Sequence, residues 1–463
     1  MMNIPDAKEI ERAVSEIRKL CKNVTTEKSE LILYGFDATK VTHTPDCVVF
    51  PESTEEVSAV VKVCAKYGLS ITPRGAGTGF AGGAVPINGG VVFAFTKMNR
   101  LLKLEKGALY VEVEPGIVNG ELGDLLKKEG LFYPPDPASL KSSTIGGNVS
   151  TGAGGPSAVK YGVTADHVMG LTVVLANGDI VETGIKTEKG VVGYNLTKLL
   201  VGSEGTLGII TRIRLKVLPL PESVITAAAF FPDRRSAVDA SLTILQKRLK
   251  PRTLEYIDKT ALESVLRFID TEIPTGSEAM LLLETDGDKD EAAREMSAIE
   301  SVCRSHNAIE FKTAEGEGEA ENLWKVRRSI SASLRKYRPT KLNEDVTVPR
   351  NRIADLMERL DELSKESGVP IVTFGHAGDG NVHVNIMTDI NDKEEYRSAL
   401  EAVDKVFDIT LELDGTLSGE HGVGLAKKPY IAKELGVTAI RLSKEIKKAF
   451  DPDNILNPGK LFP

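Results

Sequence analysis

Three glycine-rich segments in the first half of the chain constrain its fold most strongly. The first, residues 74–83, has five glycines in its last nine residues. The second covers residues 142–155 and the third residues 202–210. Glycine leaves backbone N–H groups uncovered, so they can converge on an anion such as a pyrophosphate. For each segment taken alone, the alternative to an anion-binding loop is a structural turn between two strands.

The first segment also contains the spacing G-x-G-x-x-G, at Gly77, Gly79 and Gly82. In a dinucleotide-binding β-α-β unit this spacing opens a helix. Here the chain continues through residues 84–90, which include a proline and two further glycines, into another β run at 90–95. We therefore exclude a Rossmann fold and expect a loop between two strands.

Composition limits the class of protein. The 463 residues are enough for about two to three domains. With 41% hydrophobic and 27% charged residues the chain is typical of a soluble globular protein, and its net charge of -8 argues against duplex nucleic acid as a partner. Four dispersed cysteines without a C-x-x-C pair argue against a disulfide framework or a cysteine-bound cluster; they are Cys21, Cys47, Cys64 and Cys303.

The amino-terminal sequence is charged and lacks the apolar region of a signal peptide. The sequence also contains no apolar run of about 18 residues, which a membrane-spanning helix would need. We therefore expect no signal peptide, no membrane span and a cytoplasmic enzyme.

The pattern of the sequence changes near the prolines of 218–221. Before this point, short β runs such as 169–175 alternate with glycine loops, and Asn177-Gly178 predicts a hairpin turn. After it, segments with helical periodicity alternate with single strands such as 279–284. The helical segments are 236–249, 290–305 and 322–337, followed by a last one at 438–450. This alternation predicts a second, α+β domain at about 220–415.

Three motifs carry a resemblance to a known family: Arg-Gly-Ala-Gly-Thr-Gly at 74–79, Ser-Ser-Thr-Ile-Gly-Gly-Asn at 142–148 and Gly-Ser-Glu-Gly-Thr-Leu-Gly at 202–208. In this order they resemble the vanillyl-alcohol-oxidase-type FAD-binding domain, also called the PCMH-type domain. The chain is similar to the branch of D-lactate dehydrogenases, glycolate oxidase flavin subunits and D-2-hydroxyglutarate dehydrogenases, from about Asp46 to its end.

The resemblance implies an α+β fold in three segments. An FAD-binding domain occupies 1–219, with its PCMH-type core at about 42–219. A substrate-binding α+β domain occupies 220–415, and the segment 416–463 packs back on the FAD domain.

The resemblance also implies which residues bind FAD. Segments 74–79 and 142–148 would surround the pyrophosphate and ribityl chain, and the backbone of 208–210 would meet the adenine or isoalloxazine part. Covalent members of the wider family carry a histidine where this chain has Thr78, so we expect non-covalent FAD. The expected cofactor-binding residues are Pro73, Arg74, Gly75, Ala76, Gly77, Thr78, Gly79, Pro135, Asp136, Ser142, Thr144, Gly146, Gly147, Asn148, Gly152, Tyr161, Gly162, Glu204, Gly208, Ile209, Ile210 and Asn457.

Two of the six histidines lie in Gly-His-Ala-Gly-Asp-Gly-Asn-Val-His-Val-Asn at 375–385. Asp379-Gly380 is a favoured two-residue hairpin turn. That turn would place His376 directly opposite His383, with Asn385 on the same face as His383. Two opposed imidazoles suit a shared divalent metal. Alternatively, each histidine caps a turn or fills a polar core position.

A third histidine lies in Ser-Gly-Glu-His-Gly-Val-Gly at 418–424. The D-2-hydroxyacid dehydrogenases of the family carry both motifs, with two histidines and the glutamate on a metal and the next histidine as catalytic base. The resemblance therefore implies His376, His383 and Glu420 as ligands of one divalent metal (Zn, Mn or Fe) and His421 as the base. A metal on a substrate hydroxyl lowers its pKa, an imidazole can take the proton, and flavin N5 can receive the hydride.

A substrate carboxylate also needs a cation. Residues 324–331 resemble the family segment Trp-x-x-Arg-x-x-Ile-Thr, which implies that Arg327 and Ser331, one helical turn apart, bind the carboxylate. The alternative for Arg327 is a solvated helix arginine. The resemblance adds Asn385 and Lys341 to the substrate-binding residues, although the spacing from Lys341 to the next proline departs from the family pattern. We expect Trp324 to pack rather than to bind.

Together these features predict an FAD-dependent D-2-hydroxyacid dehydrogenase that acts on D-lactate or glycolate. The electrons would pass to a separate acceptor, either a quinone or a partner such as an electron-transferring flavoprotein or an iron–sulfur subunit, and a homodimer is an option. Two alternatives are a non-redox flavoenzyme of the alkyl-dihydroxyacetone-phosphate synthase type and a flavin electron-transfer subunit of a larger complex. The histidines and the glutamate argue against both.

Overall fold

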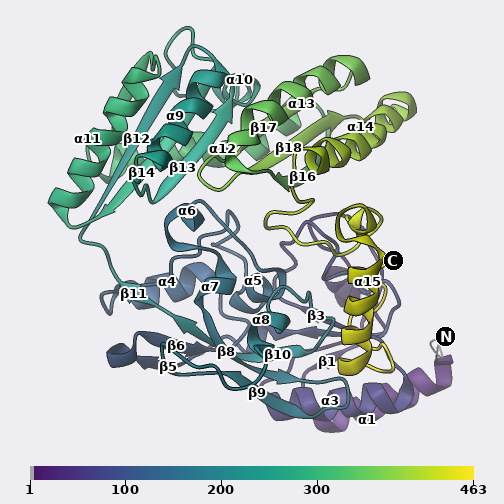
Figure 1. Cartoon of the computed structure of the whole chain (residues 1–463). Coiled ribbons are helices and arrows are strands. Elements are labelled where there is room, and N and C mark those ends of the chain that lie inside the picture. The colour runs from purple at the N-terminus through teal and green to yellow at the C-terminus, as the bar shows by residue number, and fades with distance from the viewer. Residues whose placement is uncertain (1–4) are drawn as a thin grey trace. The chain divides into compact units, whose positions relative to one another are not determined.

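The structure is a computed structural model that describes residues 5–463 (Figure 1). The first four residues of the expected amino-terminal helical region lie outside this range. The chain divides into two compact units. The first contains the residues up to Gly154, Val163–Leu220 and Glu420–Pro463, and the second contains Gly155–Gly162 and Pro221–Gly419.

The first unit contains a mixed sheet and an antiparallel sheet. In the mixed sheet, of order β1-β2-β4-β3, the last three strands are parallel. Its strands are β1 (Val24–Thr25), β2 (Cys47–Val49), β3 (Ile71–Arg74) and β4 (Val91–Ala94). The antiparallel sheet, of order β5-β6-β10-β8-β9, comprises β5 (Leu101–Glu105), β6 (Tyr110–Val113), β8 (Val168–Val174), β9 (Ile180–Gly184) and β10 (Ile209–Lys216). A small third sheet pairs β7 (Leu131–Phe132) with β11 (Leu218–Pro219).

Helices α1 (Ala7–Leu20) and α3 (Thr54–Tyr67) pack against each other, and a shared apolar core joins them to the mixed sheet. Ser53 caps the start of α3 and Gly68, at φ 67°, ends it. The other helices of this unit are α2 (Lys28–Leu31), α4 (Asn119–Lys127), α5 (Ile145–Thr151), α7 (Thr164–His167), α8 (Leu196–Leu200) and α15 (Ile431–Phe450). Gly436 interrupts α15, and the helix expected at 438–450 lies after this break.

The glycine segments take the local structures that their residues favour. Residues 75–90 form turns and bends between β3 and β4, which confirms that the first segment opens no helix. The second segment contains α5, where Thr144 Oγ1 accepts from Gly147 N and Gly152 ends the helix at φ 70°. The hairpin predicted at Asn177-Gly178 is confirmed, because the turn joins antiparallel β8 and β9.

The second unit is built on one antiparallel seven-stranded sheet of order β15-β12-β14-β13-β17-β18-β16 (Figure 1). The strands are β12 (Ser223–Phe231), β13 (Thr253–Asp258), β14 (Ala279–Gly287), β15 (Glu310–Thr313), β16 (Thr340–Thr347), β17 (Ile371–His376) and β18 (Asn381–Thr388). One face is covered by α9 (Arg234–Gln246), α11 (Lys289–Ser305), α13 (Ile353–Ser367) and α14 (Lys393–Glu412). The other face is covered by α10 (Lys259–Leu266) and α12 (Glu317–Tyr337), and α6 (Ala158–Tyr161) lies beside β13.

The buried stripe of α12 sets the orientation of that helix. Val326, Ile330 and Leu334 recur every four residues and enter the core with strand residues such as Ile257 and Phe374. Arg327 and Ser331 follow the first two members of this stripe by one position. Arg327 is partly buried at the edge of this stripe, and Ser331 is exposed.

Candidate functional site

A cavity in the first unit brings together the three glycine segments. Glu420 and His421 also line it. Fourteen of the expected cofactor-binding residues line the cavity: Pro73, Arg74, Gly75, Ala76, Gly77, Thr78, Gly79, Thr144, Gly146, Gly147, Asn148, Glu204, Gly208 and Ile210.

The other expected cofactor residues do not line the cavity. Pro135, Asp136, Ser142, Gly152 and Ile209 lie within two residues of the lining in sequence. Asn457 Nδ2 donates to the backbone oxygens of Gly83 and Glu204, which do line the cavity. Tyr161 and Gly162 belong to the second unit, where the Tyr161 hydroxyl donates to Asp286 Oδ2 at 2.8 Å.

The cavity has the features that FAD requires. A Cβ on Gly75 would lie 2.3 Å from Thr144 Oγ1, so the first and second glycine segments lie close together. A Cβ on Gly146 would lie 2.5 Å from Pro115 Cβ, so the second segment also packs closely on the residues after β6. Asn148 Nδ2 and Ser143 Oγ are buried at the cavity and have no hydrogen-bond partner within residues 5–463. Buried polar groups are normally satisfied, so these two are suited to a polar ligand. The residues present therefore fit FAD.

The guanidinium of Arg74 packs against the backbone of the first glycine loop. Its Nη1 donates to Phe36 O at 2.6 Å, and its guanidinium carbon lies 5.7 Å from the centre of the Tyr34 ring. Gly77 passes over this guanidinium at φ 71°, where a Cβ would lie 2.2 Å from Arg74 Nη2. Glycine is favoured at this position, because other residues rarely adopt this backbone angle and a Cβ would require the Arg74 guanidinium to move.

The carboxyl-terminal tail is fixed to the same cavity by Lys460, which the sequence motifs did not single out, and by a contact of Glu204. Lys460 Nζ donates to Gly83 O, Val85 O and Asn457 Oδ1 at 2.6–2.8 Å. Glu204 Oε1 accepts from Val423 N at 2.7 Å, two residues beyond His421. Burial raises the pKa of Glu204 to about 7 and lowers the pKa of Lys460 to about 7. The signal for Lys460 in the sequence is its place three residues after the expected Asn457.

The hairpin that carries two of the histidines has a different register from the predicted one. His376 pairs with Asn381, and His383 pairs with Phe374, so the prediction that the two histidines are directly opposite is wrong. Residues 377–380 form a four-residue connection instead of a two-residue turn. The observed register is shifted from the predicted register by an even number of residues, so both histidines stay on one face of the sheet. Their rings lie 5.3 Å apart, centre to centre, in an edge-to-face arrangement.

Glu255 on β13 joins two of the expected site residues. It pairs with His376 across β13 and β17, and its Oε1 hydrogen bonds to His376 Nδ1. Its Oε2 accepts from Arg327 Nε at 2.7 Å. Burial alone would raise the pKa of Glu255, but His376 and Arg327 outweigh it and lower the pKa below the usual value. The motifs did not include Glu255; the available signal was an acidic residue between Leu254 and Tyr256 within a short β run.

Arg327 is a nearly buried residue rather than a solvated helix arginine. Its side chain is 12% exposed, and its guanidinium carbon lies 4.6 Å from the centre of the Phe374 ring. Trp324, one turn earlier, packs against the core of the sheet and donates from Nε1 to Glu284 Oε1 at 2.7 Å. The expectation that Trp324 has a packing role is therefore confirmed.

The other expected substrate residues lie on the same sheet and helix. Lys341 Nζ donates to Ser331 Oγ at 2.7 Å, which brings these two residues together. Burial lowers the pKa of Lys341 to about 8. Asn385 is fully buried, and its Nδ2 donates to Val372 O and His383 O. Its Oδ1 has no hydrogen-bond partner within residues 5–463.

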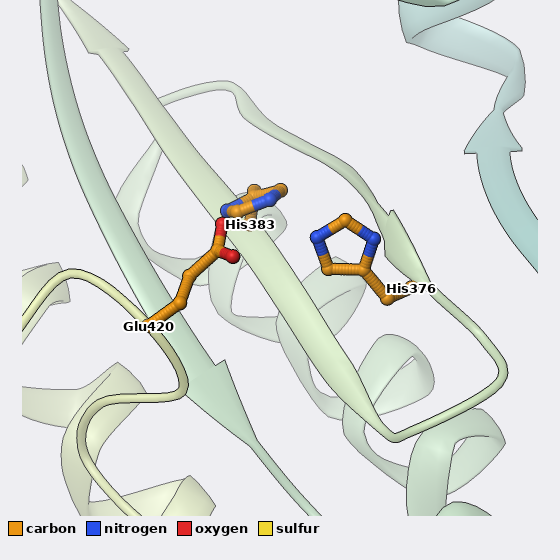
Figure 2. Close-up of side chains that lie close together, drawn as sticks. All are labelled: His376, His383 and Glu420. Carbon is orange, nitrogen blue, oxygen red and sulfur yellow. The ribbon is translucent and has the colours of Figure 1, made fainter. Parts of the chain in front are cut away.

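The three expected metal ligands form one group. His376, His383 and Glu420 each offer a ligand atom, and these atoms lie within 4.8 Å of one another (Figure 2). The segment before Glu420 is anchored beside His383, because Ser418 Oγ donates to Asp345 Oδ1 and Asp345 pairs with His383. Two imidazoles and a carboxylate are a typical donor set for zinc, manganese or iron. The residues therefore fit a divalent metal.

His421, the expected base, lines the cavity of the first unit. Its ring lies 5.1 Å from the ring of Phe80, centre to centre. Phe80 follows the glycines of the first loop and was not among the expected residues.

Comparison with known proteins identifies the class. Residues 220–461 match the family model of FAD linked oxidases, C-terminal domain, and residues 45–184 match the FAD binding domain. The chain is 41% identical to the glycolate oxidase subunit GlcD of Bacillus subtilis over 95% of this chain and 94% of that one. It is 37% identical to a D-lactate dehydrogenase of Anaerostipes hadrus, over 90% and 89% of the two chains. It is 33% identical to the D-2-hydroxyglutarate dehydrogenase of Stutzerimonas stutzeri, over 97% and 98%.

Solved structures show the same fold at low sequence identity. The chain matches p-cresol methylhydroxylase with a TM-score of 0.82 at 20% identity, over 98% of this chain and 97% of that one. It matches an alkyldihydroxyacetonephosphate synthase with a TM-score of 0.77 at 21% identity, over 99% and 86%. At these identities the likeness concerns the fold alone. The expected α+β, PCMH-type fold is confirmed.

The chain therefore belongs to the family of FAD-linked oxidases. Within it, the chain is an FAD-dependent oxidoreductase of the D-lactate, glycolate and D-2-hydroxyglutarate type, as the three glycine motifs had indicated. Across residues 5–463, the helices are all too short or too polar to cross a membrane.

Proposed function

We propose that this protein oxidises a D-2-hydroxy acid, with D-lactate or glycolate as substrate, to the 2-oxo acid. The main support for the proposal is the group of His376, His383 and Glu420. Glu255 links His376 of this group to the cation Arg327. A metal-type donor set next to a carboxylate-binding cation suits a substrate with adjacent hydroxyl and carboxylate groups. Relatives named as a glycolate oxidase subunit and a D-lactate dehydrogenase give further support.

Each protein residue has a defined task in this reaction. His376, His383 and Glu420 would hold a divalent metal, Zn, Mn or Fe, which when bound lowers the pKa of a hydroxyl group and so eases its deprotonation. His421 takes the hydroxyl proton as a general base through the lone pair of its imidazole.

The carboxylate of the substrate is held by the terminal nitrogens of Arg327, since Nε already donates to Glu255. Lys341 and Ser331 supply a second cation and a hydroxyl on the same side of the sheet. Asn385 Oδ1 offers a further polar atom. FAD, bound by the glycine loops, supplies the hydride acceptor.

The electron acceptor, the compartment and the assembly are also part of the proposal. Without a C-x-x-C pair in the sequence, we propose that electrons leave through a quinone or a separate protein, such as an electron-transferring flavoprotein or an iron–sulfur subunit. We propose the cytoplasm as the compartment, and the four cysteines, which are buried and unpaired, support a reducing environment. A homodimer is the assembly to test first.

The test is anaerobic reduction of the bound flavin by D- and L-2-hydroxy acids, followed by the flavin absorbance. We expect D-lactate or glycolate to reduce the flavin. His421→Ala should retain both FAD and metal and slow reduction by about 10²–10⁴-fold, the usual contribution of a positioned general base. His383→Ala should lose the metal and retain FAD. Normal reduction in His383→Ala, together with indifference to chelator, would contradict the proposed mechanism.

A further inference from the structure

Glu255 is a buried carboxylate whose two oxygens serve two different functional residues. The exposed fraction of its side chain is 0%, and the whole of β13 around it is buried. Oε1 is bonded to the imidazole of His376 and Oε2 to the guanidinium of Arg327. One carboxylate thus contacts both an expected metal ligand and the expected anchor of the substrate carboxylate.

We propose that Glu255 is a positioning residue that orients His376 for metal binding and fixes Arg327 relative to it. This inference rests on the proposed function and adds to it a residue that contacts neither substrate nor metal. It also predicts that Arg327 influences the metal site when no substrate is present.

The first task of Glu255 is to select the tautomer of His376. A carboxylate accepts hydrogen bonds and does not donate them when ionised, so the imidazole proton resides on Nδ1. The lone pair is then on Nε2, the atom that remains for a metal. Carboxylates that hydrogen bond to metal-binding imidazoles hold the rings in orientation, and their loss typically weakens metal affinity.

The second task is to fix the guanidinium plane of Arg327. The hydrogen bond to Glu255 uses Nε, and the Phe374 ring lies 4.6 Å from the guanidinium carbon. These two contacts leave Nη1 and Nη2 as the pair that can bind a carboxylate in bidentate fashion. Movement of Arg327 would therefore move Glu255, and through it the ring of His376.

The test compares Glu255→Gln with a matched control, Glu284→Gln. A glutamine has one acceptor oxygen, so it cannot accept from both His376 Nδ1–H and Arg327 Nε–H. Glu284 is a buried carboxylate on the neighbouring strand β14, but it accepts from Trp324 Nε1 and Thr226 Oγ1 and pairs with Arg252 at 3.6 Å. Flavin content and the far-ultraviolet circular dichroism spectrum report whether each variant is folded, because Glu284→Gln changes the hydrogen-bond partner of Trp324 itself. Glu255→Asp serves as the second variant if the glutamine fails to fold.

The main measurement is Mn²⁺ binding to the FAD-loaded, chelator-treated protein, followed by electron paramagnetic resonance without substrate. We expect Glu255→Gln to weaken Mn²⁺ binding by about 10- to 100-fold, and Glu284→Gln to leave it within about twofold of wild type. Glu255→Asp, which retains the charge, should bind Mn²⁺ more tightly than Glu255→Gln. The chain has six histidines, so ¹⁵N spectra of histidine-labelled protein can follow the His376 tautomer, which should change in Glu255→Gln alone.

A double-mutant cycle tests the connection to Arg327. Arg327→Met should weaken Mn²⁺ binding in the wild-type background and have no further effect in the Glu255→Gln background. Additive effects, or normal Mn²⁺ affinity and an unchanged His376 tautomer in Glu255→Gln, would overturn the inference while leaving the proposed function intact. A wild-type protein that binds no Mn²⁺, Zn²⁺ or Fe²⁺ would instead overturn the proposed function, and this inference with it.

Discussion

Replacement of Arg327 by methionine should destabilise the second unit as well as weaken substrate binding. The change removes the hydrogen bond from Nε to Glu255 and leaves that carboxylate with His376 alone. Removal of one partner from a buried ion pair typically costs about 3–5 kcal/mol, because the other charge stays buried. Glu255 is 0% exposed and Arg327 is 12% exposed in their side chains, so little of this cost is screened by water. Since His376 remains bonded, we expect the lower end, about 3 kcal/mol.

The assay is urea unfolding followed by the fluorescence of Trp324. This residue is the single tryptophan of the chain and lies on α12, one turn before Arg327. Its signal reports the unit that carries the substitution, which matters because a protein of two units need not unfold in one step. Flavin absorbance gives a separate signal for the first unit, and we expect that transition to be unchanged.

The double variant Arg327→Met, Glu255→Gln provides the control. Without the carboxylate charge, the loss of the guanidinium should cost much less, and at least half of the lost stability should return. If the single variant loses less than about 1 kcal/mol of its free energy of unfolding, the ion pair with Arg327 contributes little to the stability of the second unit. A double variant no more stable than the single one would refute the reasoning from the buried charge.

Three further predictions concern the two binding sites. Acid precipitation should release intact FAD, because Thr78 offers no imidazole for a covalent link; flavin that stays with the precipitate would contradict this. Gly146→Ala should lower FAD content, since its Cβ would meet Pro115 at 2.5 Å, whereas Gly123→Ala, with nothing within 4 Å, should retain FAD. The KM for the hydroxy acid should rise above about pH 8, as Lys341 loses the proton whose charge attracts the carboxylate. Lys341→Met should have a raised KM that no longer changes through pH 8, and a wild-type profile in this variant would exclude Lys341 from the site.

Sequence patterns predicted the class of fold, which is confirmed, and named most of the residues that the structure gathers in the candidate site. Glycine-rich loops, helical periodicity in the second half and the two histidine motifs each depend on residues close together in the chain. Local conformational preference explains them, as at Gly77, where the positive φ of 71° favours glycine. Such features can be found by inspection of short segments.

The tertiary structure alone decided how these parts meet. The favoured turn at Asp379-Gly380 predicts one register, but the sheet selects another, because side chains along the whole of β17 and β18 pack against neighbouring strands. Glu255 lies 121 residues from His376 and 72 from Arg327 in sequence, and Asn457 lies 374 residues from Gly83. Contacts over such separations depend on strand order and on the burial of charge within the core, and a local pattern contains no information on either.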